Sequence, residues 1–401
     1  MSILAEVAEL RNPTSVPPER LVEYATAMVM KAGSVSQLGL DAGAVLYFMQ
    51  LVRQDYQLQP YHNWPHAFYV LLFAWRALHR EPVSLLLPLP SPSSIPLVLQ
   101  EFLARLEPLE CLAVLLSAAC HDLAHPGYTN AHLATIGAER ARMYNGSFSE
   151  RYSIDRCRVL LRESDEQRGL LAPLSAQQRQ SLHDMIGDLI LCTDIMDAGV
   201  QQSVRERWHE VLRRHSPFDV ASDINVEPVR TVTRPLPTDL SHADRMGVLR
   251  LVLLCSDIGA VTDHFEECAV PWVRRLFREF YKQSLESPTQ AALKIDPFLD
   301  GQMKFLTLYA RPLLQRLTRV GFLNSFYVYM DRLDGNIDRW RRLSAHDKQR
   351  YFAADTRAVR HVLCGKVPRD RLFDLSFEPA DDVADHELPS PTPAADQSTA
   401  S

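Results

Sequence analysis

The sequence has little glycine, no excess of positive charge and no closely spaced cysteine pair. Its 43 lysines and arginines stand against 49 aspartates and glutamates, which gives a net charge of −6. A nucleic-acid-binding protein needs a basic excess or stripe, so we expect no nucleic-acid partner. The seven cysteines are an odd number and include no Cys-x-x-Cys motif. They are predicted to be reduced thiols of an intracellular protein rather than a disulfide framework.

Long hydrophobic segments are also missing. The most apolar internal run, residues 112–120, is about half as long as the roughly 20 residues that a membrane-spanning helix needs. The first residues lack the basic and continuously apolar regions of a signal peptide. We therefore expect no membrane span and a cytoplasmic location. The sequence does not decide between a monomer and a homo-oligomer.

Helical patterning is what the sequence does contain. Only 15 glycines accompany 26 prolines, and apolar residues recur at helical spacing in the segments 112–119, 182–191, 246–255 and 322–333. No Asn-Gly or Asp-Gly turn joins two alternating apolar runs, as a β-hairpin would require. The predicted fold class is therefore all-α, with helices separated by proline-containing loops at 88–96 and 215–238.

The predicted organisation is one large helical domain at residues 20–378, preceded by an N-terminal extension at 1–19. From residue 379 onward the chain is acidic and rich in Pro, Ser, Thr and Ala, without periodic apolar residues. Such a tail buries too little surface to offset its ordering entropy, so 379–401 is predicted to be disordered. The alternative is a pair of helical bundles joined near residues 215–240.

The first group of candidate functional residues is the segment Tyr-His-Asn-Trp-Pro-His-Ala at 61–67. An apolar run follows it, and proline is tolerated in a first helical turn, so a helix is predicted to begin near Asn63, a favourable N-cap. His62 and His66 would then lie close together at the start of a buried helix. Such a pair can supply a metal ligand and a proton donor to one site, although surface or core histidines show this spacing more often.

A second, more specific group is His-Asp-Leu-Ala-His-Pro-Gly at 121–127. It follows the most apolar run of the chain, so its polar side chains are expected against the core, where they need partners. A metal ion would satisfy imidazole and carboxylate together. We expect His121 and His125 on one helical face, with Asp122 beside them and the helix ending at the proline and glycine. The alternative is a hydrogen-bonded polar end of a core helix.

Two aspartates end other apolar segments. Asp257 follows the run 246–256, and Asp194 follows the run 185–193. A carboxylate in such surroundings is rarely left without a partner. Either side chain could instead cap a neighbouring helix. For Asp194, a helix cap is about as good an explanation as a role at a metal site. The more apolar context of Asp257 favours a metal ligand.

The candidate metal ligands are thus two imidazoles and two carboxylates, those of His66, His121, Asp122 and Asp257. This nitrogen and oxygen set suits Zn²⁺ or another first-row dication. Asp122 could also bridge to a second, harder ion that keeps most of its waters, Mg²⁺ or Mn²⁺. Two metals about 3.5–4 Å apart suit in-line attack on a phosphoester, and His62 would protonate the leaving oxygen.

With these residues the chain resembles the class I cyclic nucleotide phosphodiesterases, all-helical enzymes that hydrolyse 3′,5′-cyclic nucleotides to 5′-monophosphates. The motifs occur in family order: Tyr61-His-Asn-x-x-His-Ala67, His121-Asp-x-x-His-Pro-Gly127 with Asn130, Met143-Tyr-Asn145, Arg179-Gln-Ser-Leu182, Thr193-Asp194, Cys255-Ser-Asp257 and Val320-Gly-Phe322. Each motif alone is modest, whereas their order is specific. The resemblance implies a single large HD-type catalytic domain that takes a cyclic nucleotide as substrate.

The resemblance also implies roles for single residues at the metal centre. His62 corresponds to the general acid, and the four candidate ligands correspond to those of the tightly bound zinc. Asp122 corresponds in addition to the bridge to the second metal, Mg²⁺ or Mn²⁺. His125 resembles a histidine that holds metal-bound water, and Asp194 and Glu150 resemble outer carboxylates of the centre.

The base-binding pocket of the family is altered in this chain. Phe322 resembles the aromatic side of a clamp around the base, and Leu276 and Phe280 resemble the opposite wall. Ordinary core packing is the alternative for these three residues, because apolar side chains at helical spacing usually just pack. The family's base-reading glutamine is replaced by Arg319, and a second base-contacting amide is replaced by Ala260.

The arginine limits which base the pocket can select. Arginine only donates hydrogen bonds, so Arg319 would not pair with the amino group of adenine, whereas guanine offers two acceptors, O6 and N7. We expect weakened adenine selection with a tilt towards guanine, or poor discrimination if Arg319 turns to solvent. Gln315, one turn earlier, could partly substitute for the missing glutamine.

The leading functional hypothesis is hydrolysis of cAMP, cGMP or both by a two-metal centre with His62 as general acid. Two alternatives stay open. One is an HD-type phosphohydrolase that acts on other phosphoesters. The other is a phosphodiesterase-like protein that binds nucleotide with weak or no turnover; the altered pocket motivates it, and the intact metal ligands argue against it.

Overall fold

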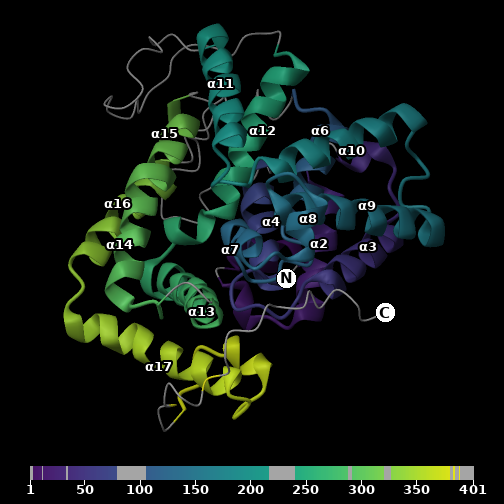
Figure 1. Cartoon of the computed structure of the whole chain (residues 1–401). Helices are drawn as coiled ribbons and strands as arrows, with labels where there is room; N and C mark the ends of the chain where they lie inside the picture. Colours follow the sequence, from purple (N-terminus) through teal and green to yellow (C-terminus); the bar gives the residue numbers. More distant parts are fainter. Residues whose placement is uncertain are drawn as a thin grey trace.

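The computed structural model describes residues 3–10, 12–32, 35–78, 105–215, 240–287, 291–319, 327–379, 383 and 388. Over these residues the chain is helical and contains no strand, which confirms the predicted all-α class (Figure 1). The α-helices are α1 (Ile3–Glu9), α2 (Pro18–Lys31), α3 (Ala42–Asp55), α4 (Trp64–Leu78), α6 (Pro108–Cys120), α7 (Asn130–Thr135), α8 (Glu139–Met143), α9 (Phe148–Arg168), α10 (Ala176–Leu191), α11 (Ala198–His215), α12 (His242–Asp257), α13 (Val270–Glu286), α14 (Ile295–Phe305), α15 (Arg311–Arg319), α16 (Tyr327–Arg341) and α17 (Ala345–Leu363).

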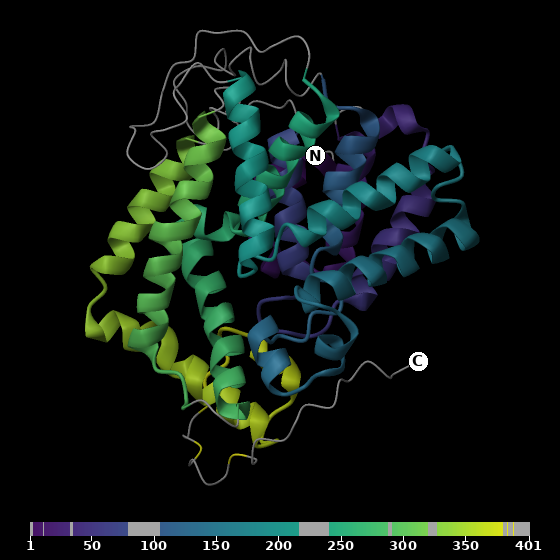
Figure 2. The same cartoon turned by 45° about the horizontal axis from the view of Figure 1, so that its top comes forward.

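The helices form two groups around a common core. In both views the earlier helices α2–α10, purple to teal, gather on one side and α13–α16, green to yellow-green, on the other (Figures 1 and 2). α12 packs on α4 and α6 of the first group and on α15 of the second. Buried residues from before and after the 216–239 gap therefore belong to one hydrophobic cluster.

The innermost helices are α4, α6 and α12. Every residue of α6 from Glu110 to Cys120 is buried, and α4 is buried over most of its length. A helix that is apolar on all sides is a core helix, because no face is left for water. The polar residues at the ends of these three helices therefore lie against the core, as the sequence predicted for residues 121–127.

Local capping explains where two of these helices begin. Asn63 precedes α4, and its Oδ1 accepts a hydrogen bond from the His66 backbone N–H at 3.1 Å, so the predicted N-cap is confirmed. At α6, Glu107 and Glu110 form a capping box and Pro108 occupies the first turn. These caps satisfy N–H groups that have no partner within the helix.

The expected end of α6 at Pro126-Gly127 is wrong. The helix ends at Cys120, and residues 121–124 form a turn in which Ala124 takes a left-handed backbone with φ 52°. His121 and His125 consequently do not share one helical face. The turn instead sends the two histidines to different neighbours.

Several expectations fall partly or wholly outside the described residues. The proline loop at 88–96 and almost all of the loop at 215–238 lie there, as does most of the tail 379–401. Val383, a described residue of that tail, is buried, and its carbonyl oxygen accepts from Arg360 Nη1 at 3.0 Å. In the N-terminal extension, Val7 of α1 is buried as well.

Two further findings concern membrane and redox chemistry. In the part of the chain that is described, no helix is both long and apolar enough to cross a bilayer. All seven cysteines are described, and none forms a disulfide. This agrees with the reduced thiols that their scattered positions predict.

Candidate metal and proton-transfer site

The four candidate metal ligands come together at the ends of the three innermost helices. His66 lies in the first turn of α4, His121 and Asp122 directly follow α6, and Asp257 is the last residue of α12. His121 Nε2 lies 3.1 Å from an Asp122 oxygen and 3.4 Å from an Asp257 oxygen. His66 Nε2 lies 3.5 Å and 3.2 Å from the same two carboxylates. Candidate ligands as far apart in sequence as His66 and Asp257, which are 191 residues apart, are thus neighbours in the fold.

The two imidazole nitrogens at this centre fit a metal ion. Nε2 of His66 and Nε2 of His121 are buried and have no hydrogen-bond partner among the described residues. The Nδ1 atom of His121 lies 3.0 Å from the Ala118 carbonyl oxygen, which fixes the proton on Nδ1 and leaves the Nε2 lone pair for a ligand bond. A buried nitrogen without a partner is costly, and a cation between the rings and the carboxylates would remove that cost.

Burial and charge also favour a cation at this position. The His66 and His121 side chains are 2% and 1% exposed, whereas those of Asp122 and Asp257 are 15% and 21% exposed, so the carboxylate side of the centre is open to solvent. Burial alone would lower the pKa of His121, but the two carboxylates raise it well above its usual value. The same negative field attracts a metal cation, and the C-terminal ends of α6 and α12 add to it.

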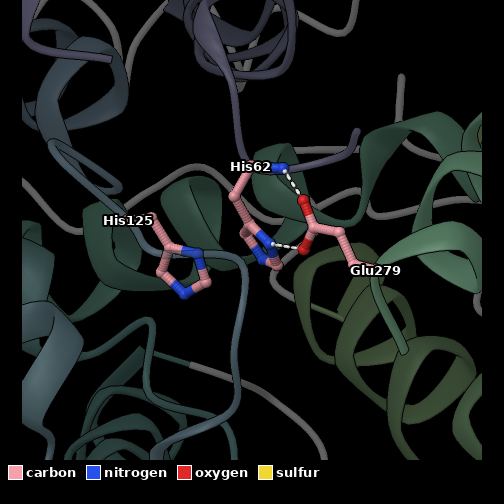
Figure 3. A group of neighbouring side chains, drawn as sticks. All are labelled: His62, His125 and Glu279. Carbon is pink, nitrogen blue, oxygen red and sulfur yellow. Dashed lines mark hydrogen bonds and ion pairs between the residues drawn. The ribbon is translucent and has the colours of Figure 1, made fainter. Parts of the chain in front are cut away.

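His62 lies beside this centre and is held by a glutamate of α13. His62 Nδ1 is 2.6 Å from Oε2 of Glu279, and the His62 backbone N–H donates to Oε1 at 2.9 Å (Figure 3). The Tyr61 backbone N–H donates to the same Oε1 at 2.8 Å. Glu279 is 1% exposed, so both of its oxygens are committed to this segment. The position and orientation of the imidazole are therefore fixed by one carboxylate.

The charges around His62 keep it protonated. Burial would lower the pKa of His62, but the negative charges of Glu279 and Asp122 outweigh burial and raise it to about 9. Burial would raise the pKa of Glu279, yet the facing imidazolium lowers it to about 2. The pair is thus an imidazolium and a carboxylate at neutral pH, which suits a proton donor.

His125 contacts His62 instead of His121. The ring centroids of His62 and His125 are 3.9 Å apart (Figure 3). His125 Nδ1 accepts from the Gly127 backbone N–H at 3.2 Å. Burial and the positive charge of His62 lower the pKa of His125 to about 3. Because Nδ1 accepts from Gly127, the neutral ring carries its proton on Nε2 and can donate a hydrogen bond there.

The two outer carboxylates of the prediction are also brought together. Asn130 Nδ2 donates to Oε2 of Glu150 at 2.9 Å and to Oδ2 of Asp194 at 3.3 Å. Burial, with the charge of Asp194, raises the pKa of Glu150 to about 7. Asp194 Oδ1 in turn accepts from the backbone N–H of Met196 at 3.0 Å. Asp194 thus lies beside Glu150 and holds the turn before α11, whereas the side chain that binds the first turn of α11 is Asp197, whose Oδ1 accepts from the Val200 N–H at 2.9 Å.

The predicted base-pocket residues are only partly described. Phe322 lies outside the described residues, and Arg319 ends α15 with a side chain that is not described. Leu276 and Phe280 lie one turn apart on α13 and pack against the hydrophobic core. Ala260 is buried in the short helical turn after α12. Their roles at a base stay predictions.

Sequence reasoning missed Glu279. The residue stands in the charged and aromatic stretch Arg-Glu-Phe-Tyr, where a glutamate is usually solvated. A signal was present, because helical spacing puts Glu279 on the same face as Leu276 and Phe280, which the family resemblance had already assigned to the pocket. Only the fold shows that this face meets Tyr61 and His62.

Comparisons with known proteins identify the family to which the chain is similar. The family model described as 3′,5′-cyclic nucleotide phosphodiesterase matches residues 61–332. A relative from Drosophila melanogaster, the high affinity cGMP-specific 3′,5′-cyclic phosphodiesterase 9A, is 24% identical over 84% of this chain and 20% of its own length. The human high affinity cAMP-specific and IBMX-insensitive 3′,5′-cyclic phosphodiesterase 8A is 21% identical over 84% of this chain and 38% of its own length.

A solved structure shares the fold. The phosphodiesterase domain of the RhoPDE fusion protein from the choanoflagellate Salpingoeca rosetta matches with a TM-score of 0.62 and 23% identity, over 82% of this chain and 93% of that one. The chain spans well under half of the length of the two curated relatives. Because the family model covers residues 61–332, more than half of the 401 residues, the chain belongs to the 3′,5′-cyclic nucleotide phosphodiesterase family.

Proposed function

We propose that this chain hydrolyses 3′,5′-cyclic nucleotides to 5′-monophosphates, with His62 as the general acid. The observation that carries the proposal is the convergence of four ligand side chains, with nitrogen–oxygen distances of 3.1–3.5 Å, beside a histidine that one carboxylate orients. Family membership supports the reaction class, and this arrangement supplies residues for each part of it.

A metal ion at His66, His121, Asp122 and Asp257 would supply positive charge to the phosphate and lower the pKa of a bound water. Zn²⁺ suits these two nitrogens and two oxygens. A second, harder ion, Mg²⁺ or Mn²⁺, would share Asp122, whose side chain is partly exposed. Glu150 and Asp194 lie together through Asn130 and would hydrogen-bond waters on that side.

His62 performs the proton transfer in this proposal. One proton of the attacking water goes to solvent, its oxygen forms a bond to phosphorus while the bond from phosphorus to O3′ breaks, and the His62 proton goes to O3′. A proton from solvent then restores the imidazolium of His62. The alkoxide is a poor leaving group, so this proton matters in the transition state. Glu279 keeps the imidazole protonated and oriented, and the neutral ring of His125, whose Nδ1 accepts from Gly127, can donate a hydrogen bond from Nε2 to a water beside the phosphate.

The base preference is a finer part of the proposal. One relative is named cGMP-specific and the other cAMP-specific, so the relatives do not select a base. Arg319 stands where the family has a glutamine, and a guanidinium can pair with O6 and N7 of guanine. We propose weakened adenine selection with a tilt towards cGMP. A cytoplasmic location belongs to the same proposal.

The test is turnover of cAMP and cGMP by metal-loaded wild type and by His62→Gln. Wild type is expected to release 5′-monophosphates, and His62→Gln is expected to lose about 10²–10⁴-fold in kcat, the usual contribution of a general acid. Tight nucleotide binding without hydrolysis would support the binding protein instead. Hydrolysis of other phosphoesters only would support an HD-type phosphohydrolase. A strong adenine preference that Arg319→Gln does not change would overturn the guanine tilt.

A further inference from the structure

Helix α13 holds the His62 segment with one face and is itself held by a buried ion-pair cluster on another. Glu279 contacts Tyr61 and His62, and Arg275, one turn earlier, has its Nη1 atom 3.5 Å from the Pro60 carbonyl oxygen. Arg274 and Arg278, also one turn apart, point to α17 and the segment after it. If α13 rotated about its axis, the contacts of Glu279 and the contacts of the two arginines would therefore change together.

The cluster is centred on Asp355 of α17, which is fully buried. Arg274 Nε donates to Asp355 Oδ2 at 2.8 Å, Arg274 Nη2 donates to Oδ1 at 3.0 Å, and Arg278 Nε donates to Oδ1 at 2.7 Å. The Arg278 side chain is 0% exposed and that of Arg274 is 17% exposed. One carboxylate thus binds two cations that have little or no access to water, and carbonyl oxygens must satisfy their remaining N–H groups.

The segment 371–375 completes the cluster with backbone oxygens. Arg278 Nη1 donates to the carbonyl oxygens of Leu372 at 2.8 Å and Asp374 at 3.1 Å, and Arg274 Nη2 donates to that of Leu375 at 3.1 Å. The chain after α17 is consequently fastened to α13 by the same two arginines. In Figure 1, α17 crosses next to α13 at the end of the molecule.

We infer that Asp355 is a positioning residue for the proposed general acid: through Arg274 and Arg278 it sets the rotation of α13 at which Glu279 can hold His62. The inference rests on the proposed function for its activity readout. Removing the charge of Asp355 is costly, because Arg278 is fully buried and cannot replace this partner with water. To reach a new partner, Arg278 or the whole of α13 would have to move. A displacement of about 1 Å at a reacting group can lower the rate about 100-fold.

The test compares two substrates in Asp355→Asn and wild type. The leaving group of a cyclic nucleotide is an alkoxide, its O3′, which needs the His62 proton. The leaving group of bis(4-nitrophenyl) phosphate is 4-nitrophenolate, which is stable without a proton. We expect kcat for the cyclic nucleotide to fall about 10–100-fold and kcat for the nitrophenyl ester to fall less than about threefold. Equal losses on both substrates, or no loss in the folded variant, would overturn the inference.

A second variant separates positioning from simple electrostatics. Asp355→Asn removes a negative charge and Arg278→Met removes a positive one, so a long-range charge effect on His62 would have opposite signs in the two. Positioning predicts that both variants lose cyclic nucleotide turnover selectively, and opposite changes would contradict it. If Asp355→Asn fails to fold, Arg274→Met replaces it, because Arg278 still binds Asp355 there.

A matched control and an independent readout complete the design. Asp165→Asn breaks another interhelical ion pair, with Arg179 at 2.7 Å, and is expected to leave the substrate ratio unchanged. The NMR signal of the His62 Nδ1 proton reports the bond to Glu279 directly, and it should shift in Asp355→Asn but not in Asp165→Asn. If wild type hydrolyses neither substrate, the proposed function fails, while an unshifted signal would refute the positioning by itself.

Discussion

Glu279 determines what the His62 imidazole can do. Its two oxygens accept from His62 Nδ1 and from two backbone N–H groups, so the glutamate sets both the charge and the direction of the ring. A histidine without this partner would be neutral above its ordinary pKa of about 6.5. The proton that the proposed reaction needs at neutral pH is therefore kept in place by a residue of another helix.

Glu279→Gln tests this dependence through pH. With a pKa of about 9, His62 is protonated at neutral pH, and removal of the carboxylate charge lowers that pKa. The alkaline limb of kcat should accordingly move to lower pH, which pH profiles from 6 to about 10 can measure. Glu286→Gln on the same helix, whose carboxylate binds Tyr128, is the control. An alkaline limb that stays in place in Glu279→Gln would contradict the assignment.

Asp257→Asn tests the metal centre. An amide in place of the carboxylate removes a charged ligand that faces both imidazoles at 3.2 Å and 3.4 Å. We expect bound metal, measured by plasma mass spectrometry, to fall and kcat to fall at least about 100-fold, beyond the 10–100-fold typical of outer partners. Asp188→Asn, which breaks an ion pair with Arg250, should keep its metal. Full metal content in Asp257→Asn would exclude this residue as a ligand.

The convergence of the candidate ligands could be predicted from the sequence, and their partners could not. His121, Asp122 and Asp257 follow apolar runs and His66 precedes one, so each polar side chain lies against the core, where it needs a partner. Glu279 stands within an amphipathic helix, and nothing in its own segment says which helix face meets residues 61–62. His125 was misplaced because the backbone reverses at Ala124, a left-handed position that a non-glycine residue seldom takes.

At the scale of elements, the start of α4 links stability to the site. Asn63 caps the helix through Oδ1, and its Nδ2 donates to the carbonyl oxygens of Gln59 at 2.7 Å and Pro60 at 3.0 Å. One buried side chain therefore holds both the helix with His66 and the loop that precedes His62. The sequence predicted the cap but not the contacts with the loop, because these depend on the conformation of residues 57–62.

Asn63→Ala is expected to destabilise the fold by about 2 kcal/mol, the upper end for a cap, because buried loop carbonyls lose their donor as well. Urea unfolding followed by circular dichroism measures this change. Ser344→Ala removes the exposed cap of α17 and should cost less, about 0.5–1 kcal/mol. Equal losses in the two variants would show that the loop contacts of Asn63 add nothing.

At the scale of the whole molecule, the site joins parts of the chain that are far apart in sequence. The candidate metal ligands come from the ends of α4, α6 and α12, and Glu279 comes from α13 of the second helix group. The helical class follows from local patterning, which the sequence shows directly. Which helices pack together does not, because Asp355 and its arginines lie about 80 residues apart and carry no local signal of their contact.

Because the candidate ligands lie at the ends of three different helices, a bound metal is expected to stabilise the folded protein. A metal that binds only the folded state stabilises it by about 2.7 kcal/mol at 100 times its Kd. The melting temperature should therefore fall after chelation and recover with Zn²⁺ in wild type, but not in Asp257→Asn. An unchanged melting temperature in wild type after verified metal removal would contradict a metal that bridges the helices.

Product analysis of a cyclic nucleotide reaction tests the central claim most directly. Metal-loaded wild type and His62→Gln are incubated with cAMP and cGMP, and the products are separated by chromatography. We expect 5′-monophosphates from wild type, with a rate that falls about 10²–10⁴-fold in His62→Gln. No turnover of either nucleotide by metal-loaded wild type, or an equal rate in the variant, would contradict hydrolysis with His62 as the acid.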